Sequence, residues 1–329
     1  MHDYKDIRSV HLEISTRCNA ACPDCPRNFR GVDVIDDYPL TDMRLDQAQK
    51  IFTESFLKQL NRIYINGNYG DFVTAQDGLK IVEYFKSVNP ALNIEISTNA
   101  SAKPHIWAPL GKLKTTVYFR IDGLKDTHHL YRQNTDFDLV ISNAKEFIAA
   151  GGKAIWTLIP FKHNQHQIEQ CWALAKELGF TRFLIQDAGR NTMPVFNKNK
   201  ELTHVIGDYQ GSVNFEELFT QYKKKHDPMI LLKGLDIVDK KIECFSKKNK
   251  EIYISATGDV YPCCWLGFYP QRDPMSIRNF QLAPMINNNN SLEHGLETAI
   301  EWFNKIEQSW NIKSVSEGKL YSCNTYCGK

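Results

Sequence analysis

The chain has 329 residues, of which 42% are hydrophobic and 24% are charged, and its formal net charge is +2. This balance is typical of a folded globular protein and excludes a disordered chain, and the small net charge gives no reason to expect a nucleic acid or an anionic membrane as partner. The sequence has neither a signal-like apolar N-terminus nor the roughly eighteen consecutive apolar residues of a membrane span, so we expect a cytoplasmic protein.

Short β-rich runs alternate with longer helical patterns over the first 187 residues. The predicted strands are residues 9–15, 62–68, 93–98, 115–122, 153–160 and 182–187. The predicted helices are residues 44–59, 76–88, 137–150 and 165–178. The last two helical patterns are followed by Gly151 and Gly179, as is typical of helix C-termini.

Strand, helix and strand in alternation predict a parallel sheet with right-handed crossovers. We therefore expect an α/β fold in which residues 1–210 form a partial (β/α)6 barrel of the TIM type. Functional side chains in such barrels follow the C-terminal ends of the strands. Residues 211–243 are expected to connect the barrel to a small C-terminal module, residues 244–329, which holds five of the nine cysteines.

The loop after the first predicted strand holds Cys18, Cys22 and Cys25, in the spacing C-x3-C-x2-C. In a reducing compartment, clustered thiols indicate metal ligands or catalytic groups rather than disulfides. Zinc sites usually close with four ligands, whereas three thiolates leave one iron of a [4Fe-4S] cluster open to an external ligand. Three structural thiols, or a zinc site, are the alternative.

This cysteine loop, placed after the first strand of a (β/α)6 barrel, resembles that of the radical S-adenosylmethionine (SAM) superfamily. In that family the open iron is chelated by the amino and carboxylate groups of SAM, and an electron from the cluster cleaves the sulfonium to a 5'-deoxyadenosyl radical. The resemblance implies a SAM-binding [4Fe-4S] cluster on Cys18, Cys22 and Cys25.

The ends of the next three strands resemble the cofactor-binding positions of the same family. NGNYGD at residues 66–71 resembles its glycine-rich turn, with Asp71 as partner of the methionyl amino group. STN at residues 97–99 resembles its ribose-contacting stretch, and RIDG at residues 120–123 resembles its SxDG motif. The implied SAM-binding residues are Gly67, Asn68, Tyr69, Gly70, Asp71, Ser97, Thr98, Asn99, Arg120, Asp122 and Arg132.

The resemblance also assigns finer roles, and the chain departs from the family at two points. Arg120 or Arg132 would hold the methionyl carboxylate through a two-pronged contact. Asp24 stands before the third cysteine, where the family usually has an aromatic residue, and GNYGDF replaces the usual GGEP. Tyr69 is expected to replace the lost contact.

The tail begins with the pattern C-x13-G-x4-C, formed by Cys244, Gly258 and Cys263, which resembles the opening of the SPASM domain. The β-rich runs around ATGD predict a hairpin that turns at residues 257–259. Because most later cysteines of that domain are absent, the tail resembles its shortened form, the twitch domain, with one auxiliary [4Fe-4S] cluster. The implied ligands are Cys244, Cys263, Cys323 and Cys327, and a structural zinc on the same thiols is the alternative.

Several polar or thiol residues lie outside these ligand sets. Cys264 is spare, and Cys171, in a helical pattern, is expected in the core. His163 is a candidate general base. Further polar residues at strand ends that are expected near the pocket are Lys162, Asn164, Gln186 and Asp187.

The resemblance implies an enzyme that cleaves SAM reductively and abstracts a hydrogen from its substrate. A net oxidation, with the auxiliary cluster as electron acceptor, is our first hypothesis. The alternatives are a redox-neutral epimerase in which Cys264 returns a hydrogen, a peptide-modifying maturase, and, in another class, a non-catalytic metal-binding module. The implied partners are a small-molecule, carrier-borne or peptide substrate and an electron donor such as flavodoxin or ferredoxin. Because the barrel begins by Ser9, we expect no N-terminal precursor-binding domain, which favours a small or carrier-borne substrate.

Overall fold

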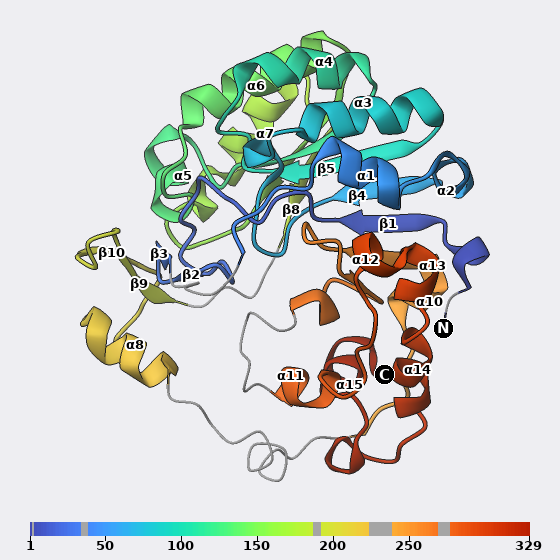
Figure 1. The fold of residues 1–329 in the computed structure, drawn as a ribbon. Coiled ribbons are helices and arrows are strands. Elements are labelled where there is room, and N and C mark those ends of the chain that lie inside the picture. Colours follow the sequence, from blue (N-terminus) through green and yellow to red (C-terminus); the bar gives the residue numbers. More distant parts are fainter. Residues whose placement is uncertain (2, 34–38, 187–191, 224–238, 269–276) are drawn as a thin grey trace.

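Within the described residues, an eight-stranded sheet forms the centre of the computed structural model (Figure 1). The structure describes residues 1, 3–33, 39–186, 192–223, 239–268 and 277–329. The strand order is β12-β11-β1-β4-β5-β6-β7-β8, and the strands from β1 to β8 in this order run parallel. They are β1 (Ser9–Leu12), β4 (Arg62–Ile65), β5 (Asn93–Thr98), β6 (Thr116–Arg120), β7 (Lys153–Leu158) and β8 (Arg182–Ile185). Their positions confirm the predicted strands and the partial barrel.

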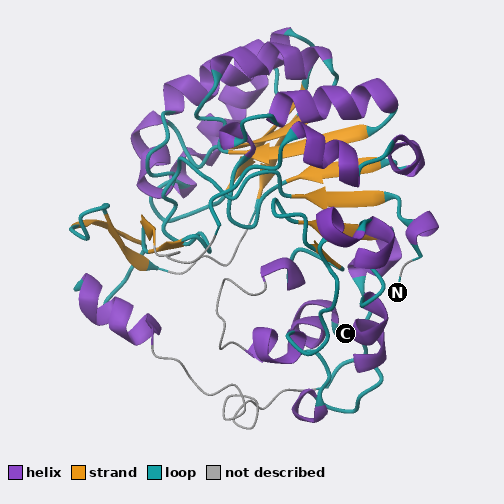
Figure 2. Cartoon of the chain, viewed as in Figure 1, coloured by secondary structure: helices purple, strands orange, loops and turns teal. Residues whose placement is uncertain are grey.

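A layer of helices packs against the outer face of this sheet (Figure 2). They are α1 (Leu45–Ile51), α2 (Glu54–Gln59), α3 (Gly78–Val88), α4 (Trp107–Lys112), α5 (Lys125–Tyr131), α6 (Phe137–Ala149) and α7 (Ile168–Glu177). Short 3-10 turns are η1 (Tyr4–Asp6), η2 (Phe72–Thr74), η3 (Pro104–Ile106) and η4 (Gln165–Gln167). No helix in the described part of the chain is long and apolar enough to cross a membrane.

The helices depart from the sequence prediction in two places. The single helix expected over residues 44–59 is wrong, because the side chain of Thr53 accepts a hydrogen bond from the backbone N–H of Phe56 and starts a second helix there. Helices α4 and α5 were not predicted. Both are short, and α4 contains Pro109 and Gly111, which weaken the helical signal.

The two faces of the barrel strands differ in chemistry. Residues at alternate positions, such as Val10, Ile63 and Ile94, are fully buried in the main hydrophobic core. The positions between them are polar and contact one another: Arg62 donates hydrogen bonds to Glu95 at 2.9 and 3.1 Å, and Tyr118 donates to the same carboxylate at 3.2 Å. A parallel sheet usually reads as apolar on both faces. The polar inner face therefore indicates that the barrel encloses a functional cavity rather than a tightly packed apolar interior.

The C-terminal tail contributes two strands to the same sheet. Strand β11 (Glu251–Ile254) pairs parallel with β1, and β12 (Val260–Tyr261) pairs antiparallel with β11, which confirms the predicted hairpin. Its turn holds Gly258 at φ +88°, a conformation that favours glycine. The tail hairpin therefore extends the barrel sheet, although the boundaries proposed for the three parts of the chain stay predictions.

The remaining tail elements are helical and lie on the β1 side of the barrel (Figure 1). They are α10 (Phe245–Asn249), η5 (Leu266–Phe268), α11 (Ile277–Leu282), α12 (Ser291–His294), α13 (Leu296–Ala299), α14 (Phe303–Ser309), η6 (Val315–Glu317) and α15 (Tyr321–Cys327). The other elements are β2 (Asn28–Phe29), β3 (Val32–Asp33), β9 (Met193–Phe196), β10 (Leu202–Ile206) and α8 (Phe215–Lys223). Strand β2 pairs with β3, and β9 with β10, in two small antiparallel sheets.

Candidate active site

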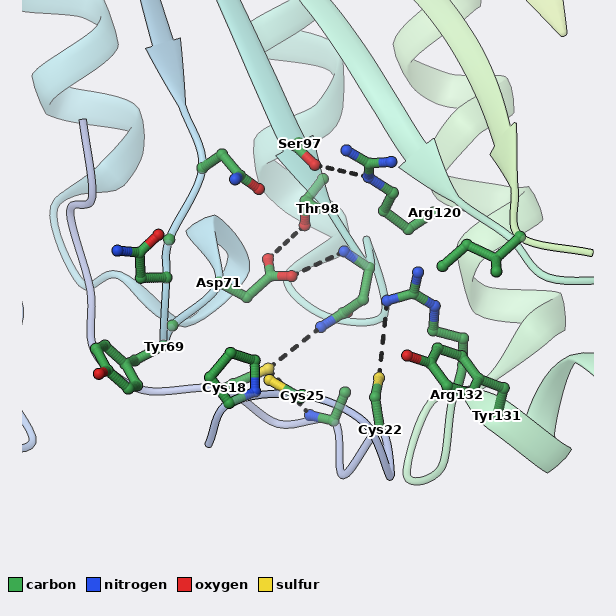
Figure 3. A pocket seen from close by; sticks show the side chains of 18 of the residues that line it. Cys18, Cys22, Cys25, Tyr69, Asp71, Ser97, Thr98, Arg120, Tyr131 and Arg132 are labelled. Atoms are coloured by element: carbon green, nitrogen blue, oxygen red, sulfur yellow. Dashed lines mark hydrogen bonds between the residues drawn. The ribbon is translucent and has the colours of Figure 1, made fainter. Parts of the chain in front are cut away.

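The cysteine loop after β1 and the C-terminal ends of β4, β5 and β6 line a cavity of about 250 Å³ (Figure 3). A cavity of this size can take an organic ligand rather than a lone ion. The predicted site residues that line it are Cys18, Cys22, Cys25, Gly67, Asn68, Tyr69, Gly70, Asp71, Ser97, Thr98, Asn99, Arg120 and Arg132. Gln186 also lines it. The structure thus brings together side chains that are more than 100 residues apart in the sequence.

The three thiols of the loop point into this cavity (Figure 3). The side chain of Asn99 reaches Cys18 Sγ at 3.8 Å, and a guanidinium nitrogen of Arg132 reaches Cys22 Sγ at 3.7 Å. Burial raises the pKa of the Cys18 and Cys22 thiols, and the charge of Arg132 acts in the opposite direction on Cys22. Without a metal, these thiols would therefore stay protonated.

The donor set fits an iron-sulfur cluster. In the described residues, no three His, Cys, Asp or Glu side chains are close enough together to hold a metal ion. A zinc ion needs every sulfur within about 2.3 Å of a single centre, whereas a [4Fe-4S] cluster binds each thiolate through a separate iron. Three thiols that line one cavity match a cluster held by three protein ligands, with one iron left open. Cys18, Cys22 and Cys25 would hold it.

The turn after β4 approaches the cysteine loop so closely that it requires glycine. A Cβ atom on Gly70 would lie 1.8 Å from the carbonyl oxygen of Ser15, and one on Gly67 would lie 2.4 Å from the carbonyl oxygen of Gly70. The backbone N–H of Asp71 donates to the carbonyl oxygen of Arg17 at 2.8 Å. The two glycines therefore allow the turn and the loop to form one wall of the cavity.

Asp71 joins this turn to the end of β5 (Figure 3). Its carboxylate accepts hydrogen bonds from the hydroxyl of Thr98, from the backbone N–H of Asn99 at 2.8 Å and from that of Val73 at 3.1 Å. Burial raises the pKa of Asp71, and these hydrogen bonds oppose the rise. A carboxylate has about four acceptor positions, so one is left for a ligand such as an amino group. The role of Asp71 toward that group stays a prediction.

The two candidate arginines have different surroundings. Arg120 donates from Nε to Ser97 Oγ at 2.8 Å and also hydrogen bonds to Gln186. Arg132 donates from Nε to Asp122 Oδ2 at 2.6 Å. Asp122 is not among the residues that line the cavity, and its buried carboxylate instead holds Arg132 against the cysteine loop.

Sequence reasoning missed Glu13, which is fully buried at the end of β1. Its Oε1 accepts hydrogen bonds from the backbone N–H groups of Tyr69 at 2.8 Å and Gly70 at 2.9 Å. Its Oε2 accepts one from the hydroxyl of Tyr253 at 2.6 Å. Burial raises the pKa of Glu13, and these hydrogen bonds oppose the rise. A charged residue between Leu12 and Ile14 was the available signal.

The four cysteines predicted for the tail cluster line another cavity together, with Trp265 and Trp310 beside them. Cys323 and Cys327 are one helical turn apart on α15, and Cys244 caps the N-terminus of α10 by accepting from the backbone N–H of Lys247. A hydrogen bond from Cys244 lowers the pKa of the Cys327 thiol to about 6. All-thiolate donor sets suit zinc or iron-sulfur clusters.

Cys171 and His163 line neither cavity, whereas Cys264 directly follows Cys263 of the predicted tail ligand set. Cys171 is fully buried on α7, which confirms its place in the core. Cys264 is not among the residues that line either cavity, but its carbonyl oxygen accepts a hydrogen bond from Asn68 at 2.9 Å. His163 stacks on Phe161, and its buried Nε2 has no hydrogen-bond partner among the described residues.

The catalytic role of His163 stays a prediction. Burial lowers its pKa to about 4, and it is not among the residues that line the cavity. Lys162 pairs with Asp208, and the buried Asn164 bonds the backbone of its own loop, so neither faces the cavity. Asp187 lies outside the described residues.

Comparisons with known proteins found similar structures but no matching sequence family. No family model and no curated protein matches the sequence. Streptococcus suis SuiB bound to S-adenosylmethionine has a similar structure, with a TM-score of 0.56 and 15% identity over 95% of this chain and 73% of SuiB. The His-tagged anSMEcpe with bound AdoMet has a TM-score of 0.54 and 15% identity over 95% of this chain and 85% of its own. The chain therefore shares the fold of these two AdoMet-bound proteins.

Proposed function

We propose that the chain is a radical SAM enzyme that cleaves SAM reductively and abstracts a hydrogen atom from its substrate. The observation that carries the proposal is the convergence of Cys18, Cys22 and Cys25 with the glycine-rich turn and Asp71 in one cavity at the C-terminal ends of parallel strands. Functional residues gather at this end in barrels of this type. When bound, the cluster and SAM supply a 5'-deoxyadenosyl radical.

Each wall of the cavity has a separate task in this proposal. The glycine-rich turn and Asp71 would hold the methionyl amino group, and residues 97–99 would hold the ribose. Arg120 or Arg132 would bind the methionyl carboxylate, because each presents guanidinium nitrogens at the cavity. These contacts would orient the sulfonium toward the three-thiol site, since orientation of the reacting atoms is a large part of catalysis.

We further propose that Cys244, Cys263, Cys323 and Cys327 hold an auxiliary [4Fe-4S] cluster. The convergence of these four thiols in one cavity supports the proposal. A cluster with four protein ligands leaves no iron open to substrate, so its role would be electron transfer. In a net oxidation the substrate would lose a hydrogen atom at the SAM cavity and then a proton to a base or to water, and the four tail thiols would hold the group that accepts the remaining electron. A zinc ion on the same four thiols would support a structural role instead.

A peptide is a second candidate substrate, beside a small or carrier-borne molecule. SuiB bound to its precursor peptide SuiA also has a similar structure, with a TM-score of 0.53 and 14% identity over 97% of this chain and 77% of that chain. This likeness supports a peptide-modifying reaction only through the shared fold.

Anaerobic incubation with SAM and dithionite tests the proposed function. We expect 5'-deoxyadenosine in the reconstituted protein and none in the Cys22→Ala variant. A non-catalytic metal-binding module would form no 5'-deoxyadenosine in either sample, and this result would overturn the proposal. A screen of deuterated peptides and small alcohols, followed by mass spectrometry of 5'-deoxyadenosine, would then identify the substrate class by deuterium transfer.

A further inference from the structure

Three side-chain hydrogen bonds connect the C-terminal tail to the wall of the SAM cavity. The hydroxyl of Tyr253 on β11 donates to Glu13 Oε2 at 2.6 Å. The side chain of Asn68 donates to the carbonyl oxygen of Cys264 at 2.9 Å. The hydroxyl of Tyr69 donates to the carbonyl oxygen of Phe268 at 3.2 Å. The tail residues therefore contact the glycine-rich turn both directly and through Glu13.

Glu13 is the centre of this arrangement because it bonds both sides. One carboxylate oxygen accepts both turn N–H groups, of Tyr69 and Gly70, and the other accepts the Tyr253 hydroxyl. The carboxylate is shielded from water, since Glu13 has no exposed surface. Hydrogen bonds to a buried charged group are stronger than neutral ones, and a lost partner is not replaced by solvent.

We propose that Glu13 is a positioning residue that sets the conformation of the glycine-rich turn and that Tyr253 anchors Glu13 from the tail, so the tail completes the SAM site. The proposal rests on the proposed function, because it assigns the turn to SAM binding. It explains why a barrel strand carries a buried carboxylate that does not line the cavity. It also gives the tail hairpin a task that is independent of any metal in the tail.

The three hydrogen bonds that Glu13 accepts predict how strongly each substitution should weaken SAM binding. Tyr253→Phe removes one hydrogen bond to the carboxylate and leaves both turn N–H groups bonded. Glu13→Gln keeps an amide oxygen for the two N–H groups and presents its amide group to the Tyr253 oxygen, which can accept. Glu13→Ala leaves two buried N–H groups without an acceptor. We therefore expect Glu13→Ala to lose more SAM affinity than either Glu13→Gln or Tyr253→Phe.

Tyr118 provides a matched control on the same inner face of the sheet. Its hydroxyl donates to Glu95 Oε2 at 3.2 Å, so Tyr118→Phe also removes a tyrosine-to-glutamate hydrogen bond between neighbouring strands. It contacts no residue of the glycine-rich turn through that bond. We expect Tyr118→Phe to leave SAM affinity unchanged.

The test combines a SAM-dependent and a SAM-independent measurement on the full reconstituted chain. Equilibrium dialysis with labelled SAM gives the dissociation constant, and the turnover of SAM to 5'-deoxyadenosine gives KM and kcat. Hydrogen exchange of the peptide that spans residues 66–71, in the absence of SAM, reports on the turn itself. For Tyr253→Phe we expect SAM affinity to fall about 10-fold, as loss of one hydrogen bond to a charged group implies, with KM raised, kcat kept within about 2-fold, and faster exchange in this peptide.

The outcomes separate this inference from the proposed function. If the unmodified protein binds SAM and Tyr253→Phe matches it in both affinity and exchange, the anchoring role is wrong and the proposed function stands. Equal acceleration of exchange by Tyr118→Phe would also overturn it, because the effect would then be general loosening of the sheet. If the unmodified protein does not bind SAM, both fail. If Glu13→Ala does not fold, the test rests on Glu13→Gln and Tyr253→Phe, which keep most of the buried contacts.

Discussion

Arg132 donates a hydrogen bond of 2.6 Å from Nε to Oδ2 of Asp122, while another nitrogen of the same guanidinium reaches Cys22 Sγ at 3.7 Å. The other oxygen of Asp122 accepts from the backbone N–H of Ile159 at 2.6 Å. The carboxylate is fully buried. The ion pair therefore fixes the cysteine loop relative to the ends of β6 and β7.

We predict that Arg132→Ala strongly destabilises the protein. The substitution leaves the buried carboxylate of Asp122 without its cation, and breaking one partner of a buried pair typically costs about 3–5 kcal/mol. Urea unfolding of both proteins measures the difference in the free energy of unfolding. Lys125→Ala, which removes an exposed partner of Asp138, is the control and should have little effect. A loss below about 1 kcal/mol for Arg132→Ala would show that Asp122 finds another partner.

Metal analysis of single cysteine variants tests both ligand sets. We expect about eight irons and eight sulfides per reconstituted chain, about four of each in Cys22→Ala and about four of each in Cys323→Ala. Cys171→Ala is the control, because Cys171 lies in the core and should leave both clusters intact. Zinc in place of the second set of four irons would contradict the auxiliary cluster and the electron-transfer role proposed for it.

Cys264→Ala tests the redox-neutral alternative. Cys264 lies next to the glycine-rich turn through its carbonyl oxygen, but its thiol belongs to neither ligand set. We expect both clusters and 5'-deoxyadenosine formation to survive the substitution. With an epimerisable substrate, loss of inversion measured by chiral chromatography would support Cys264 as hydrogen donor. Unchanged inversion would remove that role and the epimerase hypothesis in this form.

The barrel could be predicted because its signals are local. A short β-rich run marked each strand, and the strands begin within one residue of the predicted starts; β6, for example, begins at Thr116 instead of residue 115. The cysteine loop and the strand-end motifs could be placed together, since the C-terminal ends of parallel strands meet at one edge of a sheet. The cavity accordingly holds most of the residues named from the sequence.

The contacts that depend on distant parts of the chain could not be predicted. The pairing of β11 with β1 joins residues about 240 positions apart, and no local pattern specifies that partner. The roles of Glu13 and Tyr253 follow from this pairing, so both were missed. Asp122 was assigned to SAM binding from a strand-end motif, but side-chain direction decides whether such a residue faces the cavity or an arginine, and here it faces Arg132.

We predict that Gly70→Ala disrupts the glycine-rich turn. The new Cβ would lie 1.8 Å from the carbonyl oxygen of Ser15 and 2.4 Å from its carbon, and these are backbone atoms that cannot rotate away. The turn must therefore move from the cysteine loop, which should abolish SAM binding and lower the melting temperature. Gly78→Ala is the control, because its nearest neighbour is a side-chain atom at 3.2 Å. Normal SAM affinity in Gly70→Ala would contradict the close approach described above.

Buried histidines should make the protein lose stability in mild acid, and His128 gives a specific test. Its Nδ1 accepts the backbone N–H of Asp122 at 3.1 Å, so a proton there would face another donor, and burial lowers its pKa to about 4. Between pH 6.5 and 4 the imidazole of His128 binds a proton in the unfolded chain but stays neutral in the folded chain. The free energy of unfolding therefore falls by about 3 kcal/mol. In His128→Asn the amide oxygen can replace Nδ1 as acceptor. The free energy of unfolding of this variant, measured by urea titration, should therefore fall less between pH 7 and pH 4 than that of the unmodified protein, by about 3 kcal/mol. An equal loss in both proteins would mean that His128 is protonated in the fold.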